Sequence, residues 1–165
     1  MNYLKISFGI FVALAASRFI PHPPNFTSLL ALSFYVPALL GARYLPALIF
    51  SFVVTDIFIG FHSVVFFTWG SVILVGLSSK FFKKNILNRV LGSLLGACLF
   101  FIITNFGVWI SGTMYTFDLQ GLITCYVMAL PFFKGTLLGF ICYSTFLFGA
   151  LEFSKRKFQI SKNHI

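Results

Sequence analysis

The chain has 165 residues, a mass of 18.5 kDa and the length of one domain. Only 9% of its residues are charged and 59% are hydrophobic, with 24 phenylalanines, whereas soluble domains carry about 25% charged residues. A soluble domain this small cannot hide so much apolar surface. The composition therefore indicates an integral membrane protein and excludes a soluble enzyme, a disordered tail and a disulfide scaffold. The net charge of +9 does not indicate nucleic-acid binding, because the basic residues stand in short groups between apolar runs.

Six apolar stretches predict membrane-spanning helices in a single integral membrane domain, residues 1–165, because a helix crosses a bilayer with about 17–25 residues. The predicted spans are Leu4–Ile20, Phe26–Gly41, Leu45–Phe61, Val64–Ser79, Val90–Ser111 and Gly135–Phe153. Continuous apolar runs without alternation exclude a barrel, so the predicted fold class is all-α. Lys5 and Ala13-Leu14-Ala15 would also fit a signal peptide, but we expect a retained first helix. Gly121–Phe133 is apolar and too short to span, and we expect an interfacial or re-entrant helix at the outer face.

The basic residues predict the orientation of these spans. If both termini lie in the cytoplasm, only Arg18 and Lys134 fall outside. The residues that fall inside are Lys5, Arg43, Lys80, Lys83, Lys84, Arg89, Lys155, Arg156, Lys157 and Lys162. The positive-inside rule then predicts a multi-pass protein with both termini in the cytoplasm.

Most of the polar side chains in the predicted spans and turns lie toward the outer face. Asp56 is the one carboxylate away from the ends of a predicted span, and it costs at least about 2.5–3.5 kcal/mol there unless it is paired or solvated. We expect Arg18 to pair with it, either within a binding site or as a structural ion pair. Asn105 and Trp109 are four residues apart and share a helix face, and we expect both in one outward-facing pocket with Arg18 and Asp56. The predicted substrate-binding residues are Arg18, His22, Asn25, Asp56, His62, Asn105, Trp109, Tyr126 and Lys134.

Three of these residues, His22, His62 and Trp109, also have a simpler interpretation. His22 and His62 suit capping at the interface, and Trp109 suits an aromatic belt at the headgroups. Two histidines would need a third ligand to hold a metal, so we expect no metal site and no cofactor. The cysteines Cys98, Cys125 and Cys142 suit small core residues. Small residues at Gly9 and Ala13 suit either packing within the bundle or docking of another membrane subunit.

Three stretches, Arg18–Thr27, Thr104–Gly112 and Cys125–Phe133, resemble an uncharacterised bacterial family of six-helix membrane proteins. The similarity runs from about Ala16 to Leu151, with Phe140 where that family would have an acidic residue. The architecture in turn resembles the S components of energy-coupling factor (ECF) vitamin transporters. That resemblance implies a substrate-binding subunit for uptake of a vitamin or cofactor precursor in the bacterial cytoplasmic (inner) membrane. It also implies a transmembrane coupling subunit with ATPases as partner.

In S components a small-residue motif on the first helix contacts the coupling subunit, which implies partner docking by Gly9 and Ala13. The chain has no Gly-Lys-Ser/Thr phosphate-binding loop, so it cannot supply ATP energy itself. We therefore expect a small-molecule ligand, membrane lipids and a coupling subunit as partners, with no nucleic acid. Aromatic rings for stacking, with Arg18 and Lys134, favour a flat, anionic ligand.

Three other functions stay open at this point. A structural or assembly subunit would use the small-residue faces alone. An outer-leaflet membrane enzyme would use Asp56 and His62 as acid and base, and a proton-driven carrier would use Asp56 as its proton site. Neither a Ser-His-Asp arrangement nor a His-Glu-x-x-His spacing is present, so we expect no enzyme and no catalytic residues.

Overall fold

A computed structural model describes the backbone of residues 3–82 and 85–163, and side-chain environments for residues 3–82 and 85–149. The described residues form α-helices and short 3-10 helices and no strand, which confirms the all-α fold class. The elements in chain order are α1 (Tyr3–Phe19), α2 (Leu29–Leu39), η1 (Ala42–Tyr44), α3 (Leu45–Ile59), α4 (Val65–Ser78), η2 (Ser79–Phe82), α5 (Ile86–Ile110) and α6 (Leu119–Asn163).

Four helical segments among the described residues are long and apolar enough to cross a membrane. They are Ala42–Ile59, Val65–Phe82, Ile86–Ile110 and Leu119–Gly149. α1 has 17 residues and α2 has 11. The prediction of a span over Phe26–Gly41 is therefore wrong in length, because 11 residues reach only about 16 Å against a hydrocarbon core of about 30 Å.

The short helix α2 lies at the centre of the bundle. All its residues from Leu29 to Pro37 are buried, as expected of a helix that is apolar on every side. One cluster of buried side chains joins α2 to α1, α3 and α4, with Leu14 and Leu48 fully enclosed. A second cluster joins α2 to α4, α5 and α6 around Phe34. α2 begins at Leu29. The space on the N-terminal side of its first turn is therefore occupied by the preceding loop and by the hollows described below.

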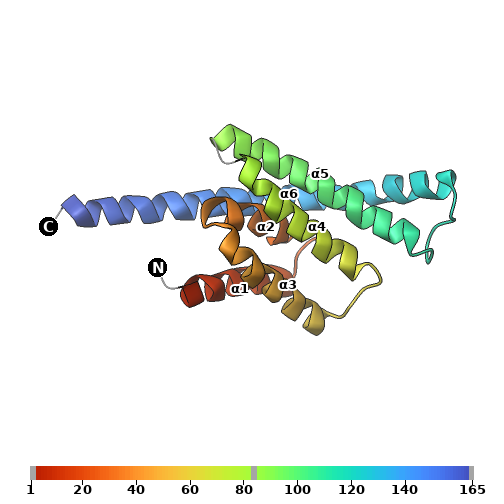
Figure 1. Cartoon of the computed structure of the whole chain (residues 1–165), viewed down its shortest axis with the longest axis horizontal. Coiled ribbons are helices and arrows are strands. Elements are labelled where there is room, and N and C mark those ends of the chain that lie inside the picture. The colour runs from red at the N-terminus through yellow and green to blue at the C-terminus, as the bar shows by residue number, and fades with distance from the viewer. Residues whose placement is uncertain (1–2, 83–84, 164–165) are drawn as a thin grey trace.

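Both termini lie at the same end of the bundle, at the left of Figure 1. The opposite end carries the loops 20–28, 60–64 and 111–118 and is called the loop end. Lys5, Arg43, Lys80 and Arg89 lie on elements at the end that carries the termini. The remaining residues predicted to be cytoplasmic lie outside the described residues or their described side chains: Lys83, Lys84, Lys155, Arg156, Lys157 and Lys162.

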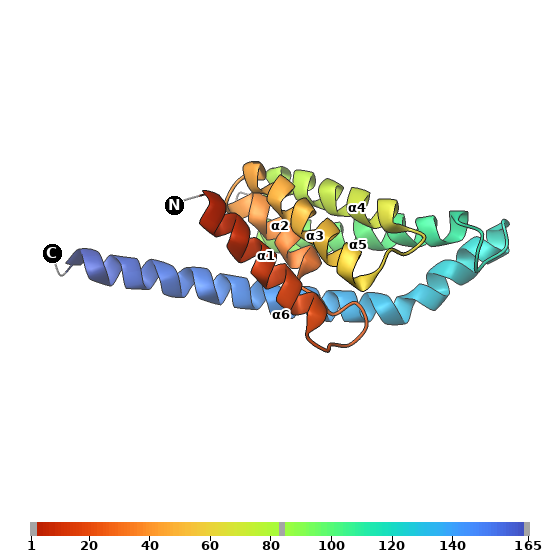
Figure 2. The same ribbon diagram turned by 90° about the horizontal axis from the view of Figure 1, so that it is seen from below.

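The predicted outer re-entrant helix is instead the first part of α6. Gly121–Phe133 and the last predicted span form one helix, Leu119–Asn163, with Pro131 inside it. Figure 2 shows the first part of α6 inclined to the rest, and the helix running on past the others toward its C-terminus. A proline inside a helix removes one hydrogen bond and bends the helix, and packing against α5 keeps the two parts joined. The predicted break is therefore a bend.

Local chemistry sets helix ends at the loop end. Gly60 closes α3 with a positive φ of +108°, a conformation that glycine adopts without strain. Asp118 begins α6 by accepting hydrogen bonds from the backbone N–H of Gly121 (2.6 Å) and the hydroxyl of Thr116 (2.9 Å), the usual chemistry of an N-cap. These two hydrogen bonds hold the pKa of Asp118 below its ordinary value, because they stabilise the carboxylate form.

The cysteines follow the prediction only in part. Cys125 is buried, and its thiol donates to the backbone carbonyl of Asn105 (3.4 Å). Cys98 and Cys142 are exposed on the outer faces of α5 and α6. An apolar helix face that meets lipid accepts the same small side chains as a core, so apolar surroundings in the sequence do not separate the two environments.

Candidate functional site: a polar cavity beside a buried ion pair

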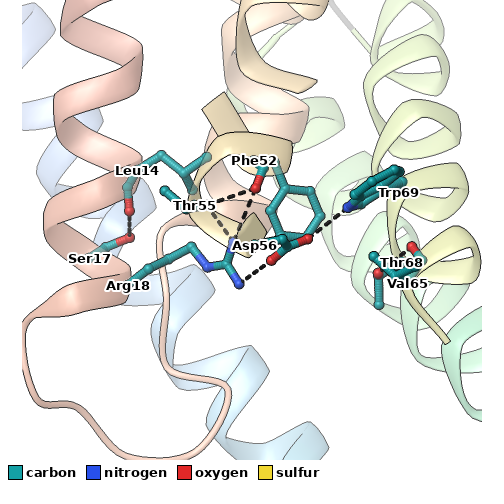
Figure 3. A network of polar contacts seen from close by, with 9 residues as sticks. All are labelled: Leu14, Ser17, Arg18, Phe52, Thr55, Asp56, Val65, Thr68 and Trp69. Atoms are coloured by element: carbon teal, nitrogen blue, oxygen red, sulfur yellow. Dashed lines mark hydrogen bonds and ion pairs between the residues drawn. The ribbon is translucent and has the colours of Figure 1, made fainter. Parts of the chain in front are cut away.

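The predicted ion pair between Arg18 and Asp56 is present. A terminal guanidinium nitrogen (Nη2) of Arg18 lies 2.6 Å from Oδ1 of Asp56, and the Asp56 side chain is only 1% exposed. The indole N–H of Trp69 donates to the other carboxylate oxygen at 2.7 Å. Figure 3 shows the three side chains, from α1, α3 and α4, meeting in one network. Both oxygens of the single carboxylate in this helix are therefore engaged.

Arg18 is held by α3 as well as by the carboxylate. Its other terminal nitrogen (Nη1) donates to the hydroxyl of Thr55 and to the backbone carbonyl of Phe52 (3.4 Å). The guanidinium also lies 4.7 Å above the centre of the Phe52 ring, within the range of a cation–π contact. The Arg18 side chain is 14% exposed. Arg18 thus stands between the buried carboxylate and the space at the loop end.

Two adjoining hollows open at the loop end beside this network. Their volumes are about 400 Å³ and about 290 Å³. They share a set of wall residues, Asn25, His62, Thr68, Phe100 and Thr136, and together they are named the polar cavity. Arg18, His22, Thr27 and Phe52 belong to the first hollow, and Phe101, Thr104, Asn105 and Phe133 belong to the second. Each volume is of the size that small-molecule sites have, and an apolar wall with a few polar groups is typical of them.

Several polar groups on this wall have no hydrogen-bond partner among the described residues. The side chains of Asn25 and His62 make no hydrogen bond. Asn105 donates its amide N–H to the carbonyl of Phe101 (2.7 Å), which leaves its amide oxygen unpaired. His22 donates Nδ1–H to a neighbouring carbonyl (2.8 Å), so its Nε2 is left without a partner. The cavity therefore offers both hydrogen-bond donors and acceptors to water or to a ligand.

The structure brings together five of the predicted site residues and separates four. Those that line the polar cavity are Arg18, His22, Asn25, His62 and Asn105. Asp56 lies behind Arg18 and is not among the wall residues. Trp109, Tyr126 and Lys134 are also absent from the wall. Of the four residues predicted to share one pocket, Arg18 and Asn105 line the polar cavity, and Asp56 and Trp109 do not.

The three residues that lie elsewhere have identifiable surroundings. Trp109 is one turn beyond Asn105, donates its indole N–H to the carbonyl of Thr116 (3.0 Å) and packs on Phe117. The hydroxyl of Tyr126 donates to a carbonyl of α5 (2.8 Å), which closes the α5–α6 contact. Lys134 is exposed. All three therefore serve loop packing, helix packing or the outer surface in this arrangement.

Sequence reasoning missed the threonines of the wall and the indole partner of Asp56. Thr68 and Thr136 lie on the wall of both hollows, and each donates to a carbonyl of its own helix (2.7 Å and 3.2 Å). Trp69 was missed as the partner of Asp56. The position of the threonines in the half of each helix near the loop end is a pattern that could have indicated them. Within the described residues no group of three or more His, Cys, Asp or Glu could hold a metal ion.

Two glycines of α6 position the loop 20–28 above the cavity. A Cβ on Gly135 would lie 2.2 Å from the carbonyl oxygen of Pro24, and one on Gly139 would lie 3.1 Å from the Cα of Phe26. No larger residue fits at Gly135 without moving the loop backbone. Because this loop carries His22 and Asn25, the glycine pair decides where those side chains stand.

The small-residue face of α1 is used differently. Gly9 and Ala13 are both exposed, and a Cβ built at Gly9 meets no described atom within 4 Å. Beside Ala13 lies an apolar hollow of about 400 Å³ between α1, the loop 20–28 and α6. In contrast, Gly92 and Gly96 of α5 face side chains inside the bundle. The geometry therefore does not favour packing within the described bundle as the role of the α1 face. The other interpretation, docking of another membrane subunit, stays a prediction.

Comparison with protein families matches residues 2–162 to a family of unknown function, DUF6580. The chain belongs to the DUF6580 family. Comparison with curated proteins and with solved structures gave no match. Membership of a family without an assigned function agrees with part of the resemblance predicted from the sequence. The link to S components has no named relative behind it, although the helical bundle does not conflict with it.

Proposed function

We propose that this DUF6580 protein is the substrate-binding membrane subunit of an uptake system for a small molecule of the vitamin or cofactor-precursor class. A separate ATP-driven module would energise it. The observation that carries the proposal is the polar cavity, where unpaired histidine and amide groups gather in an otherwise apolar chain. Asn105 lies part-buried in α5 with its amide oxygen unpaired, and such a group is costly unless water or a ligand satisfies it. Its position in one hollow of ligand size with the unpaired groups of the two loops favours binding.

The charge distribution supports a cavity that faces outward across a bacterial inner membrane. Basic residues of η1, η2 and the start of α1 lie at the end that carries both termini, and cytoplasmic loops are enriched in such residues. The polar cavity lies at the other end. With both termini in the cytoplasm, the loop end meets the outside, where an uptake subunit must take up its ligand.

The exposed face of α1 supports docking of a transmembrane coupling subunit. Gly9 and Ala13 are exposed, and a Cβ built at Gly9 meets no described atom within 4 Å. Small residues on a helix surface let a second helix approach closely. An assembly subunit of a membrane complex is the second candidate, since the same face would serve it. That candidate gives no reason for the polar cavity. An outer-leaflet enzyme is less favoured, because Asp56 is enclosed and does not share the cavity wall with His62.

The experiment that tests the proposal is enrichment of a compound from a bacterial metabolite extract by the purified full-length protein. His62 is exposed and lines both hollows, so His62→Trp would fill the cavity without entering the core. Ser63 is its exposed neighbour and is absent from both walls, which makes Ser63→Trp the matched control.

We expect mass spectrometry to find one compound retained by the wild type and by Ser63→Trp and lost from His62→Trp. Retention of the same compounds by all three proteins, or by none, would contradict the proposal.

A further inference from the structure

The polar cavity has one charged residue on its wall among the described residues, Arg18. Arg18, His22 and His62 lie on its wall, and no aspartate or glutamate does among the described residues. Asp56 is nearby, but it is 1% exposed and both of its oxygens are engaged by Arg18 and Trp69. A cation that entered the cavity would therefore meet the positive charge of Arg18 and no accessible carboxylate of the described residues.

The ion pair is oriented with its positive partner toward the cavity. Arg18 is on the wall and Asp56 is behind it, so the pair presents a positive end to a ligand even though its net charge is zero. Coulomb interactions are stronger where apolar walls exclude water. The direction of this pair therefore favours an anionic group over a cationic one.

Arg18 also has hydrogen-bond donors without a partner among the described residues. The guanidinium has five N–H groups. One terminal nitrogen contacts Thr55 and Phe52, and the other contacts Asp56. The second N–H of the nitrogen that faces Asp56, and Nε–H, have no further partner among the described residues. A carboxylate can accept hydrogen bonds from such a group while Asp56 stays bound, since charge-assisted bonds to guanidinium are strong and directional.

The rest of the wall suits a flat apolar body. Phe100 lines both hollows, and Phe101 and Phe133 line the second, with their ring centres 4.6 Å apart. Aromatic side chains contact planar rings in offset or edge geometries. The cavity thus combines an anion-favouring region near Arg18 with an aromatic region farther along.

We propose that the ligand of this cavity is a planar organic anion, with its carboxylate toward Arg18, His22 and His62 and its ring toward the phenylalanines. The inference rests on the proposed binding function and narrows its substrate class. It predicts discrimination by charge among molecules of the same shape.

Three probes with one ring system and different charges test it: naphthoate, naphthamide and naphthamidinium. Their dissociation constants would be measured by isothermal titration on the full-length protein in lipid nanodiscs. We expect naphthoate to bind at least about tenfold more tightly than naphthamidinium, with naphthamide between them. His62→Trp should abolish naphthoate binding, and Ser63→Trp should leave it unchanged, which separates cavity binding from partition into lipid.

The outcomes distinguish this inference from the function beneath it. Naphthamidinium binding as tightly as naphthoate, and lost in His62→Trp, would overturn the anion assignment and leave a small-molecule cavity standing. Binding of none of the probes, or binding that is insensitive to His62→Trp, would also overturn the assignment. The proposed function is judged separately by the metabolite extract.

Discussion

Replacement of Asp56 by alanine should destabilise the bundle by about 3 kcal/mol, because it leaves the Arg18 guanidinium without its counter-ion. Breaking a buried pair by removing one partner costs about 3–5 kcal/mol. Arg18 is 14% exposed and lines the polar cavity, so water reaches the remaining charge and the lower end of that range applies. The lost hydrogen bond from Trp69 contributes to this cost, since bonds to charged groups are worth about 1.5–3 kcal/mol.

The converse substitution should cost more. Arg18→Ala leaves the buried Asp56 carboxylate with only Trp69 as partner. The free energy of unfolding should therefore fall by about 5 kcal/mol. The double variant removes both charges, and residues in direct contact show coupling of about 0.5–3 kcal/mol. The double variant should therefore be less destabilised than the sum of the two single variants.

The assay is reversible unfolding of the purified protein in mixed micelles, followed by helical circular dichroism as sodium dodecyl sulfate is added. Ser51→Ala is the control, because Ser51 is a buried polar residue of α3 whose hydroxyl bonds only to its own helix, at 2.7 Å. We expect that variant to lose about 1 kcal/mol or less. Stability of Asp56→Ala within about 1 kcal/mol of the wild type, or additive losses in the double variant, would refute the reasoning.

Three further predictions follow from the geometry. Gly135→Ala should lose about 1–3 kcal/mol of stability and disturb the loop 20–28, since a Cβ there meets a backbone oxygen at 2.2 Å. Gly149→Ala, where a Cβ meets no described atom within 4 Å, is the control in thermal denaturation and should lose no stability, because alanine is the better helix former. Gly9→Leu should leave the thermal midpoint unchanged and abolish uptake in cells, and normal uptake would exclude docking on this face. Asp118→Ala should speed amide hydrogen exchange at Gly121 while Asp118→Asn should not. Because the pKa of Asp118 is lowered in the fold, this carboxylate stabilises the fold above its ordinary pKa, and the contribution is lost as the pH falls through the lowered value.

The sequence predicted the helices and the ion pair because single dominant forces decide them. Apolar runs in lipid must form helices to satisfy their backbone groups, and the carboxylate of Asp56 could be accommodated only by a cation within reach. Arg18 lies near the C-terminal end of α1, and Asp56 lies near the C-terminal end of α3. Because consecutive helices run in opposite directions, α1 and α3 end at the same side of the bundle, which brings Arg18 to the level of Asp56. The first inference needs no knowledge of which helix neighbours which, and the second needs only that α1 lies beside α3.

The parts that were missed depend on tertiary neighbours. An apolar stretch such as Phe26–Gly41 has the same composition whether its side chains contact lipid or other helices. In this protein the stretch contains α2, which contacts other helices. The predicted segment Gly121–Phe133 ends two residues after Pro131, whereas the helix continues through both residues and packs on α5. The four-residue spacing predicted that Trp109 and Asn105 share a face of α5. Trp109 is one helical turn closer to the 111–118 loop, and there its ring packs on Phe117.

The measurement that tests the central claim most directly is native mass spectrometry of the protein isolated from cells that express it. If the polar cavity binds a small molecule, the wild type and Ser63→Trp should each carry one adduct of the same mass per chain. His62→Trp, with its cavity filled, should carry none. The same adduct on all three proteins, or its absence from the wild type, would contradict the assignment of this cavity as a binding site.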